Sequence, residues 1–230
     1  MKEKDIDLLV GFIIGDGCIT KADNSYQIYI GHGQSQKDYC QWKLQLLNNS
    51  NIFHKKILLH TKLINNKYIQ YYFKKASKEM SFLFDLFRPN GEEKTIKNVL
   101  SYLKSNRSVA IWFMDDGGIE PCRRRLANGE MKYYNPNLKL CTHSFSYEDQ
   151  LLIRDFFKRK YQIDCNIRIE KKKRNGIIKQ YYFLRFNSEN TEKVYRKILK
   201  EYIHCCKSME YKFKHLLCAF EGYDYQYFSK

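Results

Sequence analysis

The amino-acid sequence contains one pattern twice, and this internal duplication limits the folds open to the chain. Residues 7–19 (DLLVGFIIGDGCI) form an apolar segment that ends in Asp-Gly, and residues 109–119 (VAIWFMDDGGI) repeat the pattern 100 positions later. The tyrosine-rich segments 68–77 and 178–188 also correspond, with Gln70 and Gln180 separated by 110 positions. A pattern repeated in this order predicts two copies of one structural unit in a single chain.

Hydrophobic periodicity and turn residues predict the order αββαββα for each copy. After the apolar helix of the first copy we expect a strand pair that includes 25–33, a helix over 35–47, a hairpin over 55–76 turning at Asn65-Asn66, and a helix over 77–87. In the second copy we expect strands IEPCRRRL and KLCTHSF joined through Asn128-Gly129, a helix over 146–160 capped by Ser146 with Asp149, a hairpin over 165–186 turning at Asn175-Gly176, and a helix over 188–203. The predicted fold class is α+β, with repeats at 1–90 and 107–230 and a connecting segment at 91–106.

The charge of the chain predicts the nature of its partner. The formal net charge is +16, from 41 Lys and Arg against 25 Asp and Glu in 230 residues. Such an excess favours a polyanion, and phosphate backbones are the commonest one. No apolar run approaches the ~20 residues that span a bilayer, and the N-terminal residues lack the pattern of a cleavable signal. We therefore expect an intracellular protein without a membrane, in a bacterial or phage-infected cytoplasm or an organelle matrix.

Basic and aromatic residues interleave along the predicted strands, which points to a sheet face that binds nucleic acid. An antiparallel sheet covered by helices on one face leaves the other face free. The alternative interpretation is that these lysines and tyrosines are only the solvated strand faces of an AT-rich gene product. We predict as readers of bases or holders of phosphates Lys67, Gln70, Arg123, Arg125, Lys132, Arg168, Lys172, Lys179 and Gln180.

The cysteines do not indicate a disulfide framework or a zinc site. Eight are scattered along the chain without a CxxC pair, which favours reduced thiols in an intracellular protein. His204, Cys205 and Cys206 could form half of a zinc site, but structural zinc needs four ligands at regular spacings and the other half is missing. A zinc-dependent nuclease of another fold is therefore disfavoured.

The aspartates that end the two apolar helices need an explanation. Gly after the last turn is an ordinary helix stop, but an anion at the negative end of the helix dipole is misplaced by roughly 0.3–1 kcal/mol. A plain helix stop is the alternative for either Asp-Gly alone. Two carboxylates brought together at a pair of helix ends instead require a cation.

The two motifs resemble those of the LAGLIDADG homing endonucleases. LVGFIIGDG at 9–17 and VAIWFMDDG at 109–117 match in one frame, and the likeness to the group around the omega-intron endonuclease extends to KTI at 94–96, THSF at 142–145 and MEYK at 209–212. The resemblance implies a monomeric pseudo-dimer whose antiparallel sheets form a DNA-binding saddle. It also implies double-strand cleavage of a long, specific, near-asymmetric DNA site, leaving short 3′ overhangs.

The resemblance also implies an active site. Asp16 and Asp116 would hold Mg²⁺, or Mn²⁺ as a substitute, with added carbonyl oxygens from Gly15 and Asp115. Lys94 and Lys212 would be catalytic lysines beside the cleavage site. Where the family often has a polar residue near the metal-bound water, this chain has Gly33 and Cys141, with Gln34, Thr142 or His143 as replacements.

Further expectations concern the two helices themselves. Gly11 and Gly15, four apart on one face, should let the partner helix approach closely. The Asp115 side chain should face solvent or form a salt bridge. An RNA maturase, or a DNA-binding protein of the same fold that has lost cleavage, is the alternative function. Loss of either motif aspartate would have favoured it, and both are present.

Overall fold

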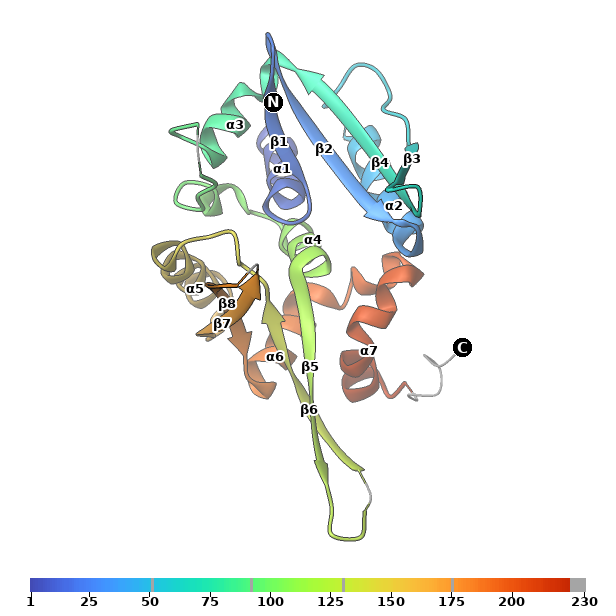
Figure 1. Cartoon of the computed structure of the whole chain (residues 1–230), viewed down its shortest axis with the longest axis vertical. Coiled ribbons are helices and arrows are strands. Elements are labelled where there is room, and N and C mark those ends of the chain that lie inside the picture. The colour runs from blue at the N-terminus through green and yellow to red at the C-terminus, as the bar shows by residue number, and fades with distance from the viewer. Residues whose placement is uncertain (51, 92, 130, 175, 224–230) are drawn as a thin grey trace. The chain divides into compact units, whose positions relative to one another are not determined.

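The computed structural model describes residues 1–50, 52–91, 93–129, 131–174 and 176–223. The chain divides into two compact units, Met1–Asp115 with Glu201–Met209 and Asp116–Lys200 with Glu210–Lys230. Each unit contains a four-stranded antiparallel sheet and helices (Figure 1). These two sheets confirm the predicted α+β class. The repeat boundaries at residues 90 and 107 stay a prediction.

The first unit follows the predicted order of elements. It comprises α1 (Glu3–Ile14), β1 (Cys18–Ala22), β2 (Ser25–Gly33), the 3-10 turn η1 (Gln34–Gln36), α2 (Lys37–Asn49), β3 (His60–Ile64), β4 (Tyr68–Ser77), η2 (Lys78–Met80), α3 (Ser81–Phe87), η3 (Leu100–Tyr102), α4 (Asn106–Asp116, whose last residue is counted with the second unit) and η5 (Ile203–Cys205). The sheet order is β1-β2-β4-β3.

Alternation along β2 determines which face of the first sheet is covered. Ile28 and Ile30 are fully buried, as is Phe73 opposite Ile30 on β4, so this face packs on the helices. Tyr29 therefore points to the other face. The tight turn between β3 and β4 lies at the predicted Asn65-Asn66, because both residues take positive φ (49° and 53°).

The second unit repeats this arrangement in its own sheet. It comprises β5 (Gly117–Arg125), β6 (Met131–Leu140), α5 (Tyr147–Tyr161), β7 (Asn166–Arg174), β8 (Ile177–Phe186), α6 (Ser188–Val194), the π-helical turn η4 (Tyr195–Leu199) and most of α7 (Lys207–Glu221), in the sheet order β5-β6-β8-β7. β6 pairs with β8 only over Leu138–Leu140. The rest of the β5–β6 hairpin therefore extends beyond the sheet, as Figure 1 shows.

Several local predictions for the second unit are confirmed. Ser146 caps α5, because its hydroxyl accepts a hydrogen bond from the backbone N–H of Asp149 (3.1 Å). The β5–β6 turn contains Gly129 with a φ of 87°. Gly176 lies at the β7–β8 turn with a φ of 80°, whereas its neighbour Asn175 lies outside the described residues.

Other predictions for the second unit are wrong. β6 ends at Leu140, and residues 142–145 form a turn instead of the predicted strand, closed by a hydrogen bond from Phe145 N–H to the Thr142 carbonyl (3.0 Å). The Gln150 side chain stabilises this turn by bonding the Thr142 and Phe145 carbonyls. The helix predicted over 188–203 is α-helical only to Val194 and continues as η4. α7 was not predicted.

Candidate active site

α1 and α4 approach closely at two glycines of α1. A Cβ at Gly11 would lie 2.8 Å from the Ser108 Cβ, and a Cβ at Gly15 would overlap the Asp115 carboxylate. Only glycine, which has no Cβ, fits at these two positions. The predicted close approach of the partner helix at Gly11 and Gly15 is therefore confirmed. The contact brings the end of the first motif against residue 115 of the second.

The start of α4 is attached to α1 by Asp7. The Asp7 carboxylate, only 3% exposed, accepts hydrogen bonds from the backbone N–H groups of Lys104 (2.8 Å) and Ser105 (3.2 Å) and from the Ser105 hydroxyl (2.5 Å). Backbone N–H groups before a helix are orphan donors, and an anion is favoured at that end of the dipole. Asp7 therefore orients α4 on α1.

Asp16 follows α1, and its carboxylate remains accessible with 43% of its side chain exposed. The helix end beside it is neutralised by Lys94, whose ammonium donates to the carbonyl oxygens of Ile13 (2.6 Å) and Ile14 (3.2 Å). A lysine at the last carbonyls offsets the negative end of the dipole. The cation that balances the negative end of α1 is therefore the Lys94 ammonium. The catalytic role of Lys94 stays a prediction.

The Asp115 side chain is not solvent-facing but forms a buried salt bridge, the second of the two arrangements expected for it. The Lys43 ammonium, on α2, lies 2.6 Å and 2.8 Å from its two carboxylate oxygens, and both side chains are fully buried. The Tyr39 hydroxyl donates to the same carboxylate (2.8 Å), and the Asp16 backbone N–H donates to it at 3.1 Å. Burial, followed by the charge of Asp115, raises the pKa of Tyr39 well above its usual value, so this hydroxyl stays a donor.

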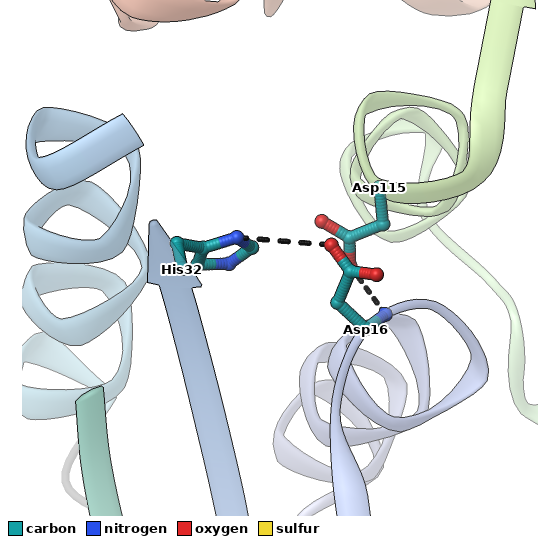
Figure 2. A group of neighbouring side chains, drawn as sticks. All are labelled: Asp16, His32 and Asp115. Carbon is teal, nitrogen blue, oxygen red and sulfur yellow. Dashed lines mark hydrogen bonds and ion pairs between the residues drawn. The ribbon is translucent and has the colours of Figure 1, made fainter. Parts of the chain in front are cut away.

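His32 connects this ion pair to Asp16. Its Nε2 lies 3.2 Å from the Lys43 ammonium, and its Nδ1 lies 3.7 Å from an Asp16 carboxylate oxygen. Figure 2 shows the ring of His32 pointing toward the Asp16 carboxylate, with Asp115 beside it. His32 is buried at the end of β2 and packs against the Tyr39 ring at 4.9 Å.

Asp16, His32 and Asp115 offer ligand atoms within 4.8 Å of one another, a spacing that could hold a metal ion. The Asp115 carboxylate, however, already accepts bonds from Lys43, Tyr39 and Asp16. A metal there would have to displace a buried ammonium. The exposed Asp16 carboxylate is the group of this cluster suited to a hard cation.

Lys43, Tyr39, His32 and Asp7 were not predicted from the sequence. A signal for Lys43 exists, because residues 39, 43 and 47 are spaced i, i+4 and i+8 and share one face of α2 with buried Tyr39 and Leu47. A lysine on an apolar helix face needs a counter-charge, since charged residues are almost never fully buried unpaired.

The second unit brings Asp116 and Lys212 into electrostatic reach of one residue, Cys141. The Asp116 carbonyl accepts a hydrogen bond from the Cys141 backbone N–H (2.9 Å). Burial raises the pKa of the Cys141 thiol, Asp116 raises it further, and Lys139 and Lys212 oppose the shift. Cys141 thus lies beside both predicted catalytic residues of this unit, whose roles stay predictions.

The polar residues expected to replace Gly33 and Cys141 have different surroundings. Gly33 ends β2, and Gln34 begins η1. The Thr142 hydroxyl is buried and bonded to Gln150 (2.5 Å), so it serves the turn before α5. His143 lies 3.3 Å from Glu170, and burial, followed by the charge of Lys172, lowers its pKa.

The free face of the first sheet carries an ordered aromatic and polar cluster around Gln70. The Tyr29 hydroxyl donates to the Gln70 side-chain oxygen (2.6 Å), and the Tyr29 ring stacks on Tyr72 with centroids 5.3 Å apart. The Lys62 ammonium lies 5.0 Å from the Tyr29 ring centroid and 5.4 Å from that of Tyr72. A Cβ at Gly31 would lie 3.0 Å from both Gln70 and Tyr29, so glycine leaves room for this pair.

The other predicted DNA-binding residues lie on strands or turns of the two sheets, and those whose side chains the structure describes are accessible. Exposed side chains are those of Lys67, Arg125, Lys132, Arg168, Lys172, Lys179 and Gln180. The Arg123 side chain lies outside the described residues. DNA contact by all of these residues stays a prediction. None of the helices that the structure describes is long and apolar enough to cross a membrane.

Comparisons with known proteins place these features in context. The family model described as the LAGLIDADG DNA endonuclease family matches residues 6–194. A probable intron-encoded endonuclease 1 of Wickerhamomyces canadensis is 28% identical over 174 residues, which are 73% of this chain and 70% of that protein. The RecA protein of Mycobacterium gastri is 25% identical over 174 residues, but the matched part of the chain spans only 39% of its length.

Two solved structures show the same fold. The homing endonuclease I-WcaI bound to its DNA recognition sequence gives a TM-score of 0.65 at 22% identity, covering 92% of this chain and 86% of that one. Mesophilic variants of the homing endonuclease I-DmoI give a TM-score of 0.50 at 14% identity, covering 86% and 96%. At these identities the likeness establishes the fold of the chain.

Proposed function

The chain belongs to the LAGLIDADG DNA endonuclease family, and we propose that it is a monomeric, divalent-metal-dependent enzyme that cuts both strands of a long, specific DNA site. The observation that carries the proposal is the pair of Asp-Gly helix ends. In the first, an accessible Asp16 carboxylate stands on a helix end whose charge is already balanced by Lys94. A carboxylate supported in this way is available for an external cation.

The two aspartates divide the chemistry between the strands in this proposal. Asp16 and Asp116 would each hold a divalent ion for the cut in one strand, with the carbonyls of Gly15 and Asp115 as further oxygen ligands. Bound Mg²⁺ would lower the pKa of the attacking water and stabilise charge on the leaving 3′ oxygen. A solved structure of I-DmoI contains DNA and Mn, which supports a divalent ion by analogy.

One lysine completes each site in this proposal. Lys94 bonds the end of the helix that Asp16 follows, and Lys212, like Asp116, influences the pKa of Cys141. An ammonium there polarises the water or neutralises the charge that builds on phosphorus. Cleavage is staggered and leaves short 3′ overhangs.

The free sheet faces would read a near-asymmetric target through the major groove. The net charge of +16 favours the phosphate contacts that dominate affinity. Because residues on the two sheets differ, the two half-sites differ too. The alternative is an RNA maturase or a non-cleaving DNA-binding protein. The cleavage selection described next distinguishes these from an endonuclease.

A cleavage selection tests the proposal. The purified protein is incubated with a randomised or genomic DNA library in Mg²⁺, and in Ca²⁺ as the non-catalytic control. We expect recurrent double-strand breaks at one long site in Mg²⁺ only. Specific retention of DNA without breaks under both ions would support the binding-protein alternative.

Asp16→Asn tests the role of the carboxylate at the site so found. The substitution is isosteric and removes the charge that would hold the ion, so double-strand cutting should be lost while DNA affinity in Ca²⁺ is kept. Gel-shift and cleavage assays on the same duplex measure both. Loss of DNA binding together with cutting would mean that the carboxylate is structural.

A further inference from the structure

We propose that the buried ion pair of Lys43 and Asp115 is a positioning device for the Asp16 carboxylate, acting through the Asp16 main chain and through His32, and that it serves the cut made at Asp16 alone. This inference rests on the proposed endonuclease function. It assigns a role to the side chains of Lys43, Asp115 and His32, none of which contacts DNA or the metal ion in that proposal.

The first route is the main chain of Asp16. One Asp115 carboxylate oxygen accepts the Asp16 N–H (3.1 Å) and a bond from Lys43 (2.8 Å). The other oxygen accepts from Lys43 (2.6 Å) and from the Tyr39 hydroxyl (2.8 Å). With four hydrogen bonds from three donor groups in fixed directions, the carboxylate cannot rotate. The backbone of Asp16 is thereby held where the chain leaves α1.

The second route is the imidazole of His32. An ammonium offers only donors, so the His32 Nε2 that lies 3.2 Å from Lys43 must be an acceptor. The ring proton is then on Nδ1, the nitrogen 3.7 Å from the Asp16 carboxylate. This distance is longer than a hydrogen bond, but the N–H dipole points at the anion and favours one orientation of it. Lys43 therefore favours the His32 tautomer with its proton on Nδ1, which faces the Asp16 carboxylate.

The position of Lys43 is fixed by its own surroundings. Its ammonium lies 4.5 Å from the Tyr39 ring centroid and 5.7 Å from that of Phe12, and the side chain is fully buried. Aromatic faces on a cation add to the attraction of the carboxylate. The network is therefore preorganised before DNA arrives, as a support for a reacting group must be.

The second repeat has a different arrangement at the corresponding helix positions. Aligning the helices at Ser35 and Ser146 sets Gln150 opposite Tyr39 and Arg154 opposite Lys43. Arg154 is exposed, whereas Gln150 is buried and bonds Thr142 (2.5 Å to its hydroxyl, 2.9 Å to its carbonyl). The charged network thus supports the first motif, so its loss should affect the two strands unequally.

Strand-resolved cleavage tests this asymmetry. A duplex carrying the selected site, labelled on each strand in turn, is cut in Mg²⁺ by the wild type and by Lys43→Met. Loss of the support should slow one strand by roughly 10–100-fold, the usual effect of removing an outer-shell partner, and nicked DNA should accumulate. Equal slowing of both strands, or no slowing, would overturn the inference.

Two further variants guard against a merely misfolded protein. Lys43→Met combined with Asp115→Asn leaves no lone buried charge, and it should show the same shift in the ratio of strand rates. Arg154→Met, the matched change in the second repeat, should leave that ratio unchanged. Gel-shift affinity in Ca²⁺ should be the same for all of them.

A readout without DNA or metal tests the His32 route separately. Nitrogen-15 NMR of the imidazole should show the proton on Nδ1 in the wild type and a mixture of tautomers in Lys43→Met. A wild-type His32 protonated on Nε2 would overturn this route. Absence of cleavage by the wild type would count against the proposed function, while the tautomer measurement would still decide the structural inference.

Discussion

Replacing Lys43 with methionine should destabilise the first unit more than the loss of any exposed lysine. Methionine keeps most of the volume but leaves Asp115 buried without its counter-charge, and both side chains are fully buried in the pair. Removing one partner of a buried ion pair costs about 3–5 kcal/mol. At about 2–4 °C per kcal/mol for a chain of this size, the thermal midpoint should fall by roughly 6–20 °C.

Urea and thermal unfolding, followed by circular dichroism without DNA or metal, measure this loss. Adding Asp115→Asn to Lys43→Met removes the stranded charge and should recover at least about 1 kcal/mol. Lys55→Met, at an exposed lysine of the same unit, should stay within about 0.5 kcal/mol of the wild type. The reasoning fails if Lys43→Met behaves like Lys55→Met, or if the double variant is less stable than Lys43→Met.

Two other perturbations test the contact between α1 and α4. Gly11→Ala places a Cβ 2.8 Å from the Ser108 Cβ, and overpacking of roughly 1–3 kcal/mol should outweigh the gain of about 1 kcal/mol in helix propensity. Gly33→Ala, whose Cβ meets no described atom within 4 Å, is the control and should change urea stability little. Asp7→Ala leaves the donors of Lys104 and Ser105 without their acceptor and should lower the free energy of unfolding by about 2–4 kcal/mol in the same assay. Asp7→Asn keeps an acceptor and should lower it less. Equal losses would mean that Asp7 contributes packing and not hydrogen bonding.

Much of the fold could be predicted because its signals are local. β2 shows a period of two in its burial, and the Asn65-Asn66 turn is recognised because asparagine tolerates positive φ. The turn at 142–145 was mistaken for a strand because its stability depends on the side chain of Gln150. A run of β-compatible residues does not reveal such a partner.

The candidate site was predicted only in part for a related reason. Asp16 and Lys94 could be named from motifs, but the buried pair of Lys43 and Asp115 joins residues 72 positions apart. Neither residue alone indicates burial, since lysine and aspartate are mostly exposed. The pairing appears only when three helices and a strand have assembled around it.

The contrast between Gly15 and Asp115 has a consequence for taking the protein apart. These two positions correspond in the duplicated motifs, yet one must be glycine to make room for the carboxylate of the other. A homodimer of the first copy would bury Lys43 without an anion, and a homodimer of the second would set an aspartate against an aspartate. Anyone who expresses the two copies as separate chains therefore has to supply both chains together. Divergence after duplication has made the first and second copies obligate partners that cannot replace each other.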